Sequence, residues 1–248
     1  KKNKSKIICL TAYSKNIAEI VDDHVDIVLV GDSLGSVLYN YDTTRKVSLN
    51  MMIEHTKSAR MGIKKSLLVI DLPHNTYRNK SEALKNSKKA IKETKCDAVK
   101  VEGGTRVKEI VKHLVKNKIP VLGHIGITPQ TTKGKFRSKG KNESEKRKLL
   151  KDAQDLEQSG AFGIVLECIY SDISKTITNL INIPTIGIGA SVNCDGQVLV
   201  TDDLIGLNET KFRFVKKFGN IKKYIKSAVI KYKNSVKQKK FPSKKNSY

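Results

Sequence analysis

Short apolar runs rich in β-branched residues recur along the chain, and the segments between them are more polar. Eight of these runs have the length of a strand: residues 6–12, 26–30, 66–70, 98–101, 120–123, 163–167, 184–189 and 197–200. A continuous apolar run of about four to eight residues is typical of a strand that is buried on both faces. The pattern therefore predicts eight buried strands.

Between most of these runs, apolar residues recur three and four positions apart, which is the spacing of one face of a helix. Four segments show this spacing: 105–118, 142–159, 171–180 and 220–236. Asn142 and Glu145 also stand at the separation of a helix-capping pair. The apolar stripe of the last segment is expected to be buried, through Ile221, Ile225, Ala228, Val229 and Tyr232.

Strands that alternate with helices over 248 residues favour a (β/α)8 TIM barrel. A doubly wound open sheet is the alternative. It is disfavoured because no G-x-G-x-x-G follows the first predicted strand, and because side chains suited to catalysis lie at more strand ends than one crevice needs. We expect one barrel domain over residues 1–248, a rim loop or lid at 131–142, and a mobile lysine-rich tail from about residue 237.

Five of the predicted strands end in residues that can take part in chemistry. At or near these ends stand Asp32, Asp71, Lys100 with Glu102, His124 and Glu167. In a parallel barrel, the carboxyl ends of all strands face the same rim. Carboxylates, a lysine and a histidine on one rim predict an active site there.

Three of these acids, Asp32, Asp71 and Glu102, are followed by small or turn-forming residues. Converging carboxylates repel one another unless a cation lies between them. Oxygen ligands of this kind suit Mg²⁺. Taken singly, each acid could instead be a solvated strand end or a helix cap, but together they predict a metal site.

Glu167 lies in apolar sequence, and because burial disfavours the charged form of a carboxylate, it could act as a general base. The alternative is a buried glutamate paired with a neighbouring lysine or histidine. His124 could be a neutral donor to a developing oxyanion, or a core histidine whose hydrogen bonds are satisfied. Lys100 points into the barrel if Val99 and Val101 face the helices, and a buried lysine needs a partner or an anionic ligand.

These side chains suggest the enolisation of a 2-oxo acid. In such a reaction, a metal polarises the keto group while a base removes the adjacent proton. Composition and spacing do not identify the electrophile that the enolate would attack.

The net charge of +24 at first suggests a nucleic-acid-binding protein. Of the 48 basic residues, however, only 7 are arginines, and the basic residues are spread along the whole chain. Aromatic residues make up only 6% of the sequence. Recognition of phosphates and bases favours arginine and stacking aromatics. We therefore expect no nucleic-acid partner.

No apolar run approaches the ~20 residues that span a bilayer. The four cysteines are scattered, which fits reduced thiols better than a disulfide framework. We therefore expect a cytoplasmic protein with no membrane segment.

Ordered motifs cover essentially the whole chain: LTAY at 10–13, VGDSLG at 30–35, DLP at 71–73, VKVEGG at 99–104, GHIGITPQ at 123–130, VLEC at 165–168, IGIGA at 186–190 and DGQVLV at 195–200. In this order they closely resemble the ketopantoate hydroxymethyltransferase family. The resemblance implies a barrel of the phosphoenolpyruvate/pyruvate type and a homodecamer. It also implies transfer of a one-carbon unit from 5,10-methylenetetrahydrofolate to 3-methyl-2-oxobutanoate, giving 2-dehydropantoate for pantothenate and coenzyme A.

The resemblance further implies roles for the residues at the strand ends. The residues around Mg²⁺ would be Asp32, Asp71 and Glu102, the first two being its nearer ligands. The residues that hold the keto acid would be Asp32, Ser33, Asp71 and Lys100. The catalytic residues would be Glu167, as the acceptor of the C3 proton, and His124, near the enolate oxygen.

Four positions depart from the usual wording of the family: Ser14, Tyr170, Ser191 and Asn246. The loop after Gln130 is also unusually rich in lysine. The nearest rival enzyme is another metal-dependent barrel that acts on 2-oxo acids, such as an isocitrate-lyase-like lyase or a mutase. Those enzymes typically carry a reactive-cysteine segment such as K-K-C-G-H, which does not occur in this sequence.

Overall fold

A computed structural model of the protein describes residues 5–132, 137–209 and 212–248. The chain divides into two compact units, Lys1–Val200 and Thr201–Tyr248, and each is described by itself. The single domain over residues 1–248 and the mobile tail from about residue 237 stay predictions.

The first unit is a closed barrel of eight parallel strands in sequence order, with β1 paired to β8. The strands are β1 Ile7–Thr11, β2 Ile27–Val30, β3 Leu67–Asp71, β4 Ala98–Glu102, β5 Val121–Gly126, β6 Gly163–Glu167, β7 Thr185–Ile188 and β8 Gly196–Leu199. Each overlaps one of the eight predicted runs. The predicted TIM barrel is confirmed, and the open sheet is excluded because the strands close on themselves.

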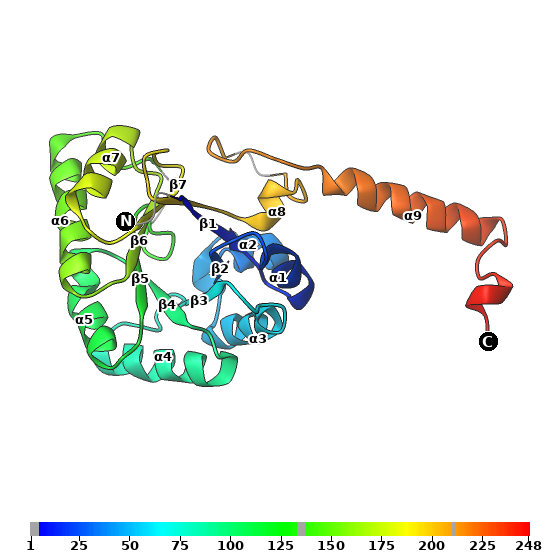
Figure 1. Ribbon diagram of the computed structural model, residues 1–248, viewed down its shortest axis with the longest axis horizontal. Helices are drawn as coiled ribbons and strands as arrows, with labels where there is room; N and C mark the ends of the chain where they lie inside the picture. The colour runs from blue at the N-terminus through cyan, green and yellow to red at the C-terminus, as the bar shows by residue number, and fades with distance from the viewer. Residues whose placement is uncertain (1–4, 133–136, 210–211) are drawn as a thin grey trace. The chain divides into compact units, whose positions relative to one another are not determined.

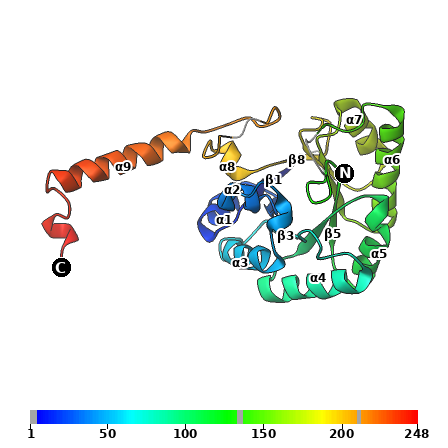
Figure 2. The same cartoon turned by 180° about the vertical axis from the view of Figure 1, so that it is seen from behind.

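Helices follow most of the strands and lie outside them (Figure 1). They are α1 Lys15–Val21, α2 Leu34–Tyr39, α3 Leu49–Arg60, α4 Lys80–Thr94, α5 Lys108–Lys116, α6 Glu143–Gln158 and α7 Ser171–Leu180, with 3₁₀ turns η1 Thr44–Lys46 and η2 Thr105–Val107. Figure 2 shows from behind that the strands lie inside the same ring of helices. The predicted cap of α6 is present, since the side chain of Asn142 accepts a hydrogen bond from the Glu145 amide at 2.9 Å.

Every strand contributes to an apolar layer inside the barrel. This layer consists of Cys9, Ile27, Leu29, Val69, Ala98, Leu122, Val165, Ile186 and Val198. Alternate residues such as Val99 and Val101 belong to the second core, which packs between the strands and the helices. Because side chains alternate along a strand, the residue two places beyond an inner-layer residue points into the barrel as well.

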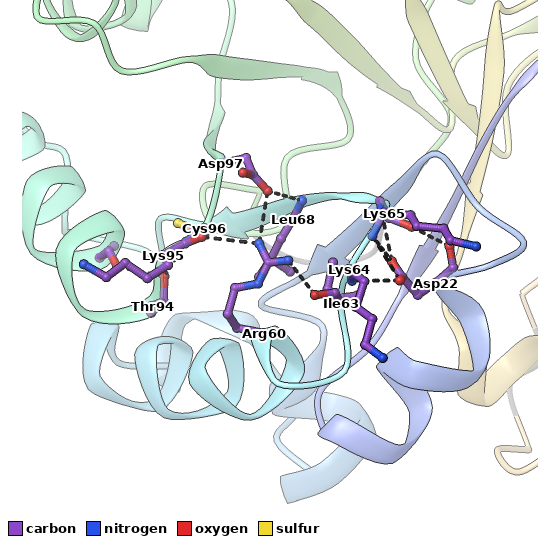
Figure 3. A network of polar contacts seen from close by, with 12 residues as sticks. Asp22, Arg60, Ile63, Lys64, Lys65, Leu68, Thr94, Lys95, Cys96 and Asp97 are labelled. Atoms are coloured by element: carbon purple, nitrogen blue, oxygen red, sulfur yellow. Dashed lines mark hydrogen bonds and ion pairs between the residues drawn. The ribbon is translucent and has the colours of Figure 1, made fainter.

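Hydrogen bonds at the amino-terminal ends of β3 and β4 tie the barrel to its helices (Figure 3). The carboxylate of Asp22 accepts from the backbone amides of Lys64, Lys65 and Ser66, at 2.7 Å for the shortest contact. Arg60 donates to the carbonyl of Ile63 at 2.8 Å. These contacts lie at the end of the strands opposite the candidate active site, where a barrel usually holds its stabilising residues.

The second unit contains α8 Thr201–Leu204, α9 Ile221–Lys237 and the 3₁₀ turn η3 Lys244–Asn246. Helix α9 has the predicted position, but the predicted burial of its apolar stripe is wrong, because no residue of α9 is buried. Val229 and Tyr232, for example, are exposed. The spacing of apolar residues predicts the helix and its stripe, but not what covers the stripe.

The expected rim loop at 131–142 is described only in part, and its residues 133–136 lie outside the described residues. Residues 131–132 and 137–142 form no helix and only an isolated bridge from Lys139 to Ile169. A role as a lid stays a prediction. Among the described residues, no helix has both the length and the hydropathy that a bilayer span requires.

Candidate active site

The barrel alternation explains why the acids, the lysine and the histidine gather at one rim. Asp71 stands two residues beyond Val69, and Lys100 and Glu102 stand two and four residues beyond Ala98. The same step leads from Leu122 to His124 and from Val165 to Glu167. The strand register also sets Asp71 opposite Lys100 and Glu102 opposite His124.

Asp71 links the ends of three strands. Its Oδ1 accepts a hydrogen bond from Lys100 Nζ at 2.8 Å, and its Oδ2 accepts one from the Asp32 backbone amide at 3.0 Å. All three residues are buried. Burial alone would lower the pKa of Lys100, but the carboxylates of Asp71, Glu102 and Asp32 outweigh it and raise the pKa above the usual value. Lys100 therefore points into the barrel and has a partner, as predicted, and the charged ammonium is its favoured form.

Asp32 lies in the turn between β2 and α2, close to two other acids. Burial is the main cause that raises its pKa to about 8, and the charges of Asp71 and Glu102 add to it. The carboxylate is bonded at Oδ2 by the Gln130 side-chain amide at 2.9 Å. The next residue, Ser33, places its Oγ 2.9 Å from the hydroxyl of Tyr13.

His124 lies between two carboxylates. Its Nδ1 is 3.4 Å from Glu102 Oε1, and its Nε2 is 3.1 Å from Glu167 Oε2. Neither contact has the alignment of a hydrogen bond, and among the described atoms neither ring nitrogen has another partner. Burial and the charge of Lys100 oppose protonation, but Glu102 and Glu167 outweigh them and raise the pKa of His124 to about 9. The neutral donor, one of the two roles considered for His124 from the sequence, is therefore not the favoured form, because the flanking carboxylates stabilise the imidazolium.

Glu102 is also enclosed, whereas Glu167 is not. Burial would raise the pKa of Glu102, but His124 and Lys100 outweigh it and lower the pKa below the usual value. The side chain of Glu167 is 21% exposed, against 1% for Glu102. The apolar sequence around Glu167 therefore does not fully bury its carboxylate, which lies beside His124 as in the alternative of a paired glutamate.

Gln130 joins the acids and was not singled out from the sequence. Its side-chain amide donates to Asp32 at 2.9 Å and to the carbonyl of Leu72 at 3.0 Å, and its backbone amide donates to Glu102 Oε2 at 3.1 Å. The Tyr77 hydroxyl donates to its Oε1. The only sequence signal for Gln130 is its place at the end of the GHIGITPQ motif, after the strand that carries His124.

The donor set fits a divalent cation in its chemistry. Four carboxylates face one lysine and one histidine, and the mutual repulsion of Asp32, Asp71 and Glu102 contributes to the raised pKa of Asp32. Carboxylate oxygens are the ligands that Mg²⁺ prefers. As they stand, no three Asp, Glu, His or Cys side chains of the described residues are grouped closely enough to hold an ion. The amide of Gln130 and the ammonium of Lys100 bond oxygens of Asp32 and Asp71 instead.

The arrangement can remove a proton next to a carbonyl group. Glu167 supplies a partly exposed carboxylate, and the charged groups of Lys100 and His124 can stabilise negative charge on oxygen. All the predicted acids, with Lys100 and His124, come together in one set of contacts that includes Ser33 through the turn after β2.

Two of the positions that depart from the motifs, Ser191 and Tyr170, have other surroundings. The hydroxyl of Ser191 is bonded by Ser171 at 3.1 Å and by the backbone amide of Asn193 at 3.2 Å, which tie it into the turn after β7. Tyr170 is half exposed just before α7.

The sequence matches a family model described as ketopantoate hydroxymethyltransferase over residues 1–244. Over its whole length it is 62% identical to the 3-methyl-2-oxobutanoate hydroxymethyltransferase of Pelagibacter ubique (strain HTCC1062), covering 96% of that protein. It is 46% identical over 96% of the chain to the enzyme of the same name from Rhizobium etli (strain ATCC 51251 / DSM 11541 / JCM 21823 / NBRC 15573 / CFN 42), covering 88% of it.

Solved structures resemble the fold at low sequence identity. A phosphonopyruvate hydrolase in complex with oxalate and Mg²⁺ matches 97% of this chain and 88% of its own, with a TM-score of 0.63 and 9% identity. The 2,3-dimethylmalate lyase of the PEP mutase/isocitrate lyase superfamily matches 74% of this chain and 66% of its own, with a TM-score of 0.54 and 15% identity. These likenesses support the (β/α)8 barrel fold.

Proposed function

The chain belongs to the ketopantoate hydroxymethyltransferase family, and from that premise we propose how its barrel mouth carries out the reaction. The protein is an enzyme that transfers a hydroxymethyl group to 3-methyl-2-oxobutanoate. The product of this transfer is 2-dehydropantoate, and we place the reaction in the synthesis of pantothenate and coenzyme A. The observation that carries the proposal is the contact set that joins four strands around Asp71, Lys100, His124 and Glu167.

In this proposal the keto acid is held at the ends of β2, β3 and β4. Lys100 offers a buried positive charge to the substrate carboxylate, which is a strong interaction where water is excluded. Ser33 offers a hydroxyl, oriented by Tyr13, and Asp32 and Asp71 complete the binding site.

Mg²⁺ would be held by Asp32 and Asp71 as its nearer ligands, with Glu102 beside them. The surplus of carboxylates at the mouth supports this assignment. When bound, the cation supplies positive charge where the keto oxygen becomes negative.

Glu167 is proposed to accept the proton from C3 of the keto acid. Its side chain is the most exposed of the charged groups in the contact set, so a substrate can reach it. His124, 3.1 Å from Glu167, orients the carboxylate and provides positive charge near the enolate oxygen. The C–H electrons then form the new bond from C3 to the one-carbon unit.

The one-carbon donor is proposed to be 5,10-methylenetetrahydrofolate. Its methylene carbon is attacked by C3, its bonds to the two folate nitrogens break, and one water supplies the hydroxyl oxygen. The two folate nitrogens take up two protons, one delivered by Glu167 and one from the water, whose second hydrogen stays in the new hydroxyl group.

We further propose that the enzyme works in the cytoplasm as a homodecamer, with no nucleic-acid partner. The scattered lysines support the last point, because 48 basic residues include only 7 arginines. A lyase or mutase on the same fold is the rival, and it would also enolise a 2-oxo acid.

The proposal is tested by hydrogen exchange at C3 of 3-methyl-2-oxobutanoate in deuterated water, followed by proton NMR. The unmodified protein should catalyse the exchange without any folate, and removal of divalent cations with EDTA should slow it. Added methylenetetrahydrofolate should then convert the keto acid to 2-dehydropantoate. Cleavage or rearrangement of the keto acid without a folate would instead support the lyase or mutase.

A further inference from the structure

A small pocket lies between the loop after β3 and the first turns after β4. It has a volume of about 140 Å³, and its lining includes His74, Tyr77, Arg78, Arg106, Val107 and Ile110. A pocket for a whole small-molecule ligand usually measures about 300 Å³ or more. This pocket is therefore suited to one end of a longer molecule.

The pocket adjoins the candidate active site through a short chain of hydrogen bonds. Tyr77 lines the pocket, and its hydroxyl donates to Gln130. The Gln130 side-chain amide in turn bonds Asp32 at 2.9 Å. A molecule with one end in the pocket can therefore extend toward the keto acid held at the barrel mouth.

Positive charge is concentrated at the pocket. Arg45 and Arg106 both lie close enough to His74 to lower its pKa, in addition to the larger effect of burial. Arg45 donates to the carbonyls of Gln130 at 3.0 Å and Thr132 at 2.8 Å, so these contacts do not neutralise its charge. Arg78 is paired with Glu82 at 3.0 Å and contributes less.

Arg106 stands out because its guanidinium is free. Within residues 5–132, 137–209 and 212–248, no hydrogen bond or ion pair to it is found. The group lies back against Gly103, where an added Cβ would be 3.3 Å from its Nη2. It thus lies near the carboxyl end of β4, and Arg106 stands four residues after Glu102. A guanidinium presents a planar pair of donors that matches a carboxylate.

Part of the lining is apolar. Val107 and the ring of Tyr77 are buried, and Ile110 is half-buried. The pocket thus combines an apolar wall with a free guanidinium. This combination fits a ligand whose carboxylate is carried on an aromatic or aliphatic arm.

We propose that this pocket binds a glutamate carboxylate of the folate donor, with Arg106 as the main partner. The inference rests on the proposed function, in which the donor is a reduced folate. A folate carries its reactive carbon on the pterin side and its glutamate beyond an aminobenzoyl ring, so the two ends can occupy neighbouring sites. The keto acid, whose carboxylate is assigned to Lys100, does not need the pocket.

The test measures binding of tetrahydrofolate by isothermal titration calorimetry to the unmodified protein, Arg106→Ala and Lys112→Ala. Lys112 is an exposed residue on α5 outside the pocket, so its variant matches the change in net charge. Because a hydrogen-bonded charge pair contributes about 1.5–3 kcal/mol, Arg106→Ala should bind tetrahydrofolate at least about ten-fold more weakly. Lys112→Ala should bind it as the unmodified protein does.

A second arm uses tetrahydrofolate with both glutamate carboxylates converted to amides. The unmodified protein should bind this diamide more weakly, and Arg106→Ala should cause little further loss. In steady-state assays, Arg106→Ala should raise the KM for the donor and change the KM for the keto acid little. A rise in the keto-acid KM alone would assign Arg106 to the other substrate and overturn the inference.

Equal tetrahydrofolate affinity in Arg106→Ala and the unmodified protein would also overturn the inference. So would a finding that Arg106→Ala weakens binding of the diamide as much as it weakens binding of tetrahydrofolate. Failure of the proposed function has a different signature. In that case the unmodified protein does not exchange the C3 proton of the keto acid, a measurement that involves neither folate nor Arg106.

Discussion

Buried charges at the barrel mouth are stabilised mainly by one another. The Asp71 carboxylate balances the positive charge of Lys100 and accepts a hydrogen bond from the backbone amide of Asp32. One carboxylate therefore sets the positions of two neighbours. Breaking such a pair is costly, because the remaining charge stays buried without a partner. Substitutions that keep the shape of a side chain therefore give the clearest tests of its role.

Asp71→Asn should weaken Mg²⁺ binding at least about ten-fold, because even outer partners of metal sites contribute about 10–100-fold to affinity. The amide oxygen can still accept the Asp32 amide, but Lys100 loses its charged partner, so urea unfolding checks that the variant is folded. Mg²⁺ titration by calorimetry in the presence of 3-methyl-2-oxobutanoate measures the effect. Asp42→Asn is the control, since Asp42 is exposed and paired only with Lys46. Equal Mg²⁺ affinity in Asp71→Asn and the unmodified protein would remove Asp71 from the ligand set.

The sequence predicts the charged residues at the mouth better than the neutral ones. Asp32, Asp71, Lys100 and Glu102 follow apolar runs, and a charge after a buried strand is conspicuous. Gln130 follows no strand directly, and an amide in a loop has no distinctive pattern. Its role depends on loop geometry that brings its backbone and side chain to two acids at once, and spacing alone does not reveal that geometry.

At the scale of elements, the pairing of β5 with β6 positions the proposed base. Gly126 ends β5 opposite Glu167 and has a φ of 102°, which favours glycine. A Cβ at this position would lie 2.2 Å from the Glu167 carbonyl oxygen. The strand that carries Glu167 can therefore come this close only because residue 126 has no side chain.

Gly126→Ala should displace Glu167, and the strained backbone should destabilise the fold by about 1–3 kcal/mol. The kcat should fall more than the KM for the keto acid, since the base moves while Lys100 stays in place. Urea unfolding and steady-state kinetics measure the two effects. Gly219→Ala is a matched control, because an added Cβ there meets its nearest atom at 3.5 Å. Normal kinetics in a folded Gly126→Ala would contradict this role for the strand pairing.

The opposite ends of the strands have a structural role that depends on pH. Burial alone would raise the pKa of Asp22, but hydrogen bonds from the amides of Ser66, Lys64 and Lys65 outweigh it and lower the pKa below 3.8. A lowered pKa means that the folded state favours the ionised form. Its stabilising effect is therefore present above the usual pKa and is lost as the pH falls through the lower, folded-state value.

Asp22→Asn should lower the free energy of unfolding at pH 7 by about 2 kcal/mol, because it removes charge-assisted hydrogen bonds. The difference from the unmodified protein should shrink as the pH is lowered below about 4, near the usual pKa of an aspartate. Urea unfolding over a pH series provides the measurement. Asp23→Asn, which alters an exposed acid paired with Lys65, should change little. A difference that stays constant down to pH 3 would exclude this assignment for Asp22.

The barrel elements follow closely from local sequence, whereas α9 shows where that reasoning ends. Segment 171–180 forms α7 at the predicted bounds, and 163–167 forms β6. Apolar runs and helical stripes decide these elements locally. The stripe of α9 is present but unburied, because burial depends on a partner surface that local periodicity does not encode.

At the scale of the whole molecule, closure of the barrel brings distant residues into one site. Asp32 follows β2 and Glu167 ends β6, and the parallel order of all eight strands places both at the same rim. The hydrogen bonds of Asp22 and Arg60 stabilise the amino-terminal ends of the strands. The residues at the opposite rim are therefore available to bind the substrate. The family shows which reaction takes place, and the rim shows which side chains are available for it.

The central claim is that Glu167 removes the C3 proton of the keto acid at this rim. Solvent-deuterium exchange at C3 of 3-methyl-2-oxobutanoate, measured by NMR for Glu167→Gln, tests it most directly. Glu19→Gln on α1 serves as the control, since Glu19 is an exposed acid that takes no part in the contacts described at the rim. Because a general base contributes about 10²–10⁴-fold, exchange should fall at least about 100-fold in Glu167→Gln, with keto-acid binding largely kept. Exchange at the unmodified rate in a folded Glu167→Gln that still binds the keto acid would contradict the claim.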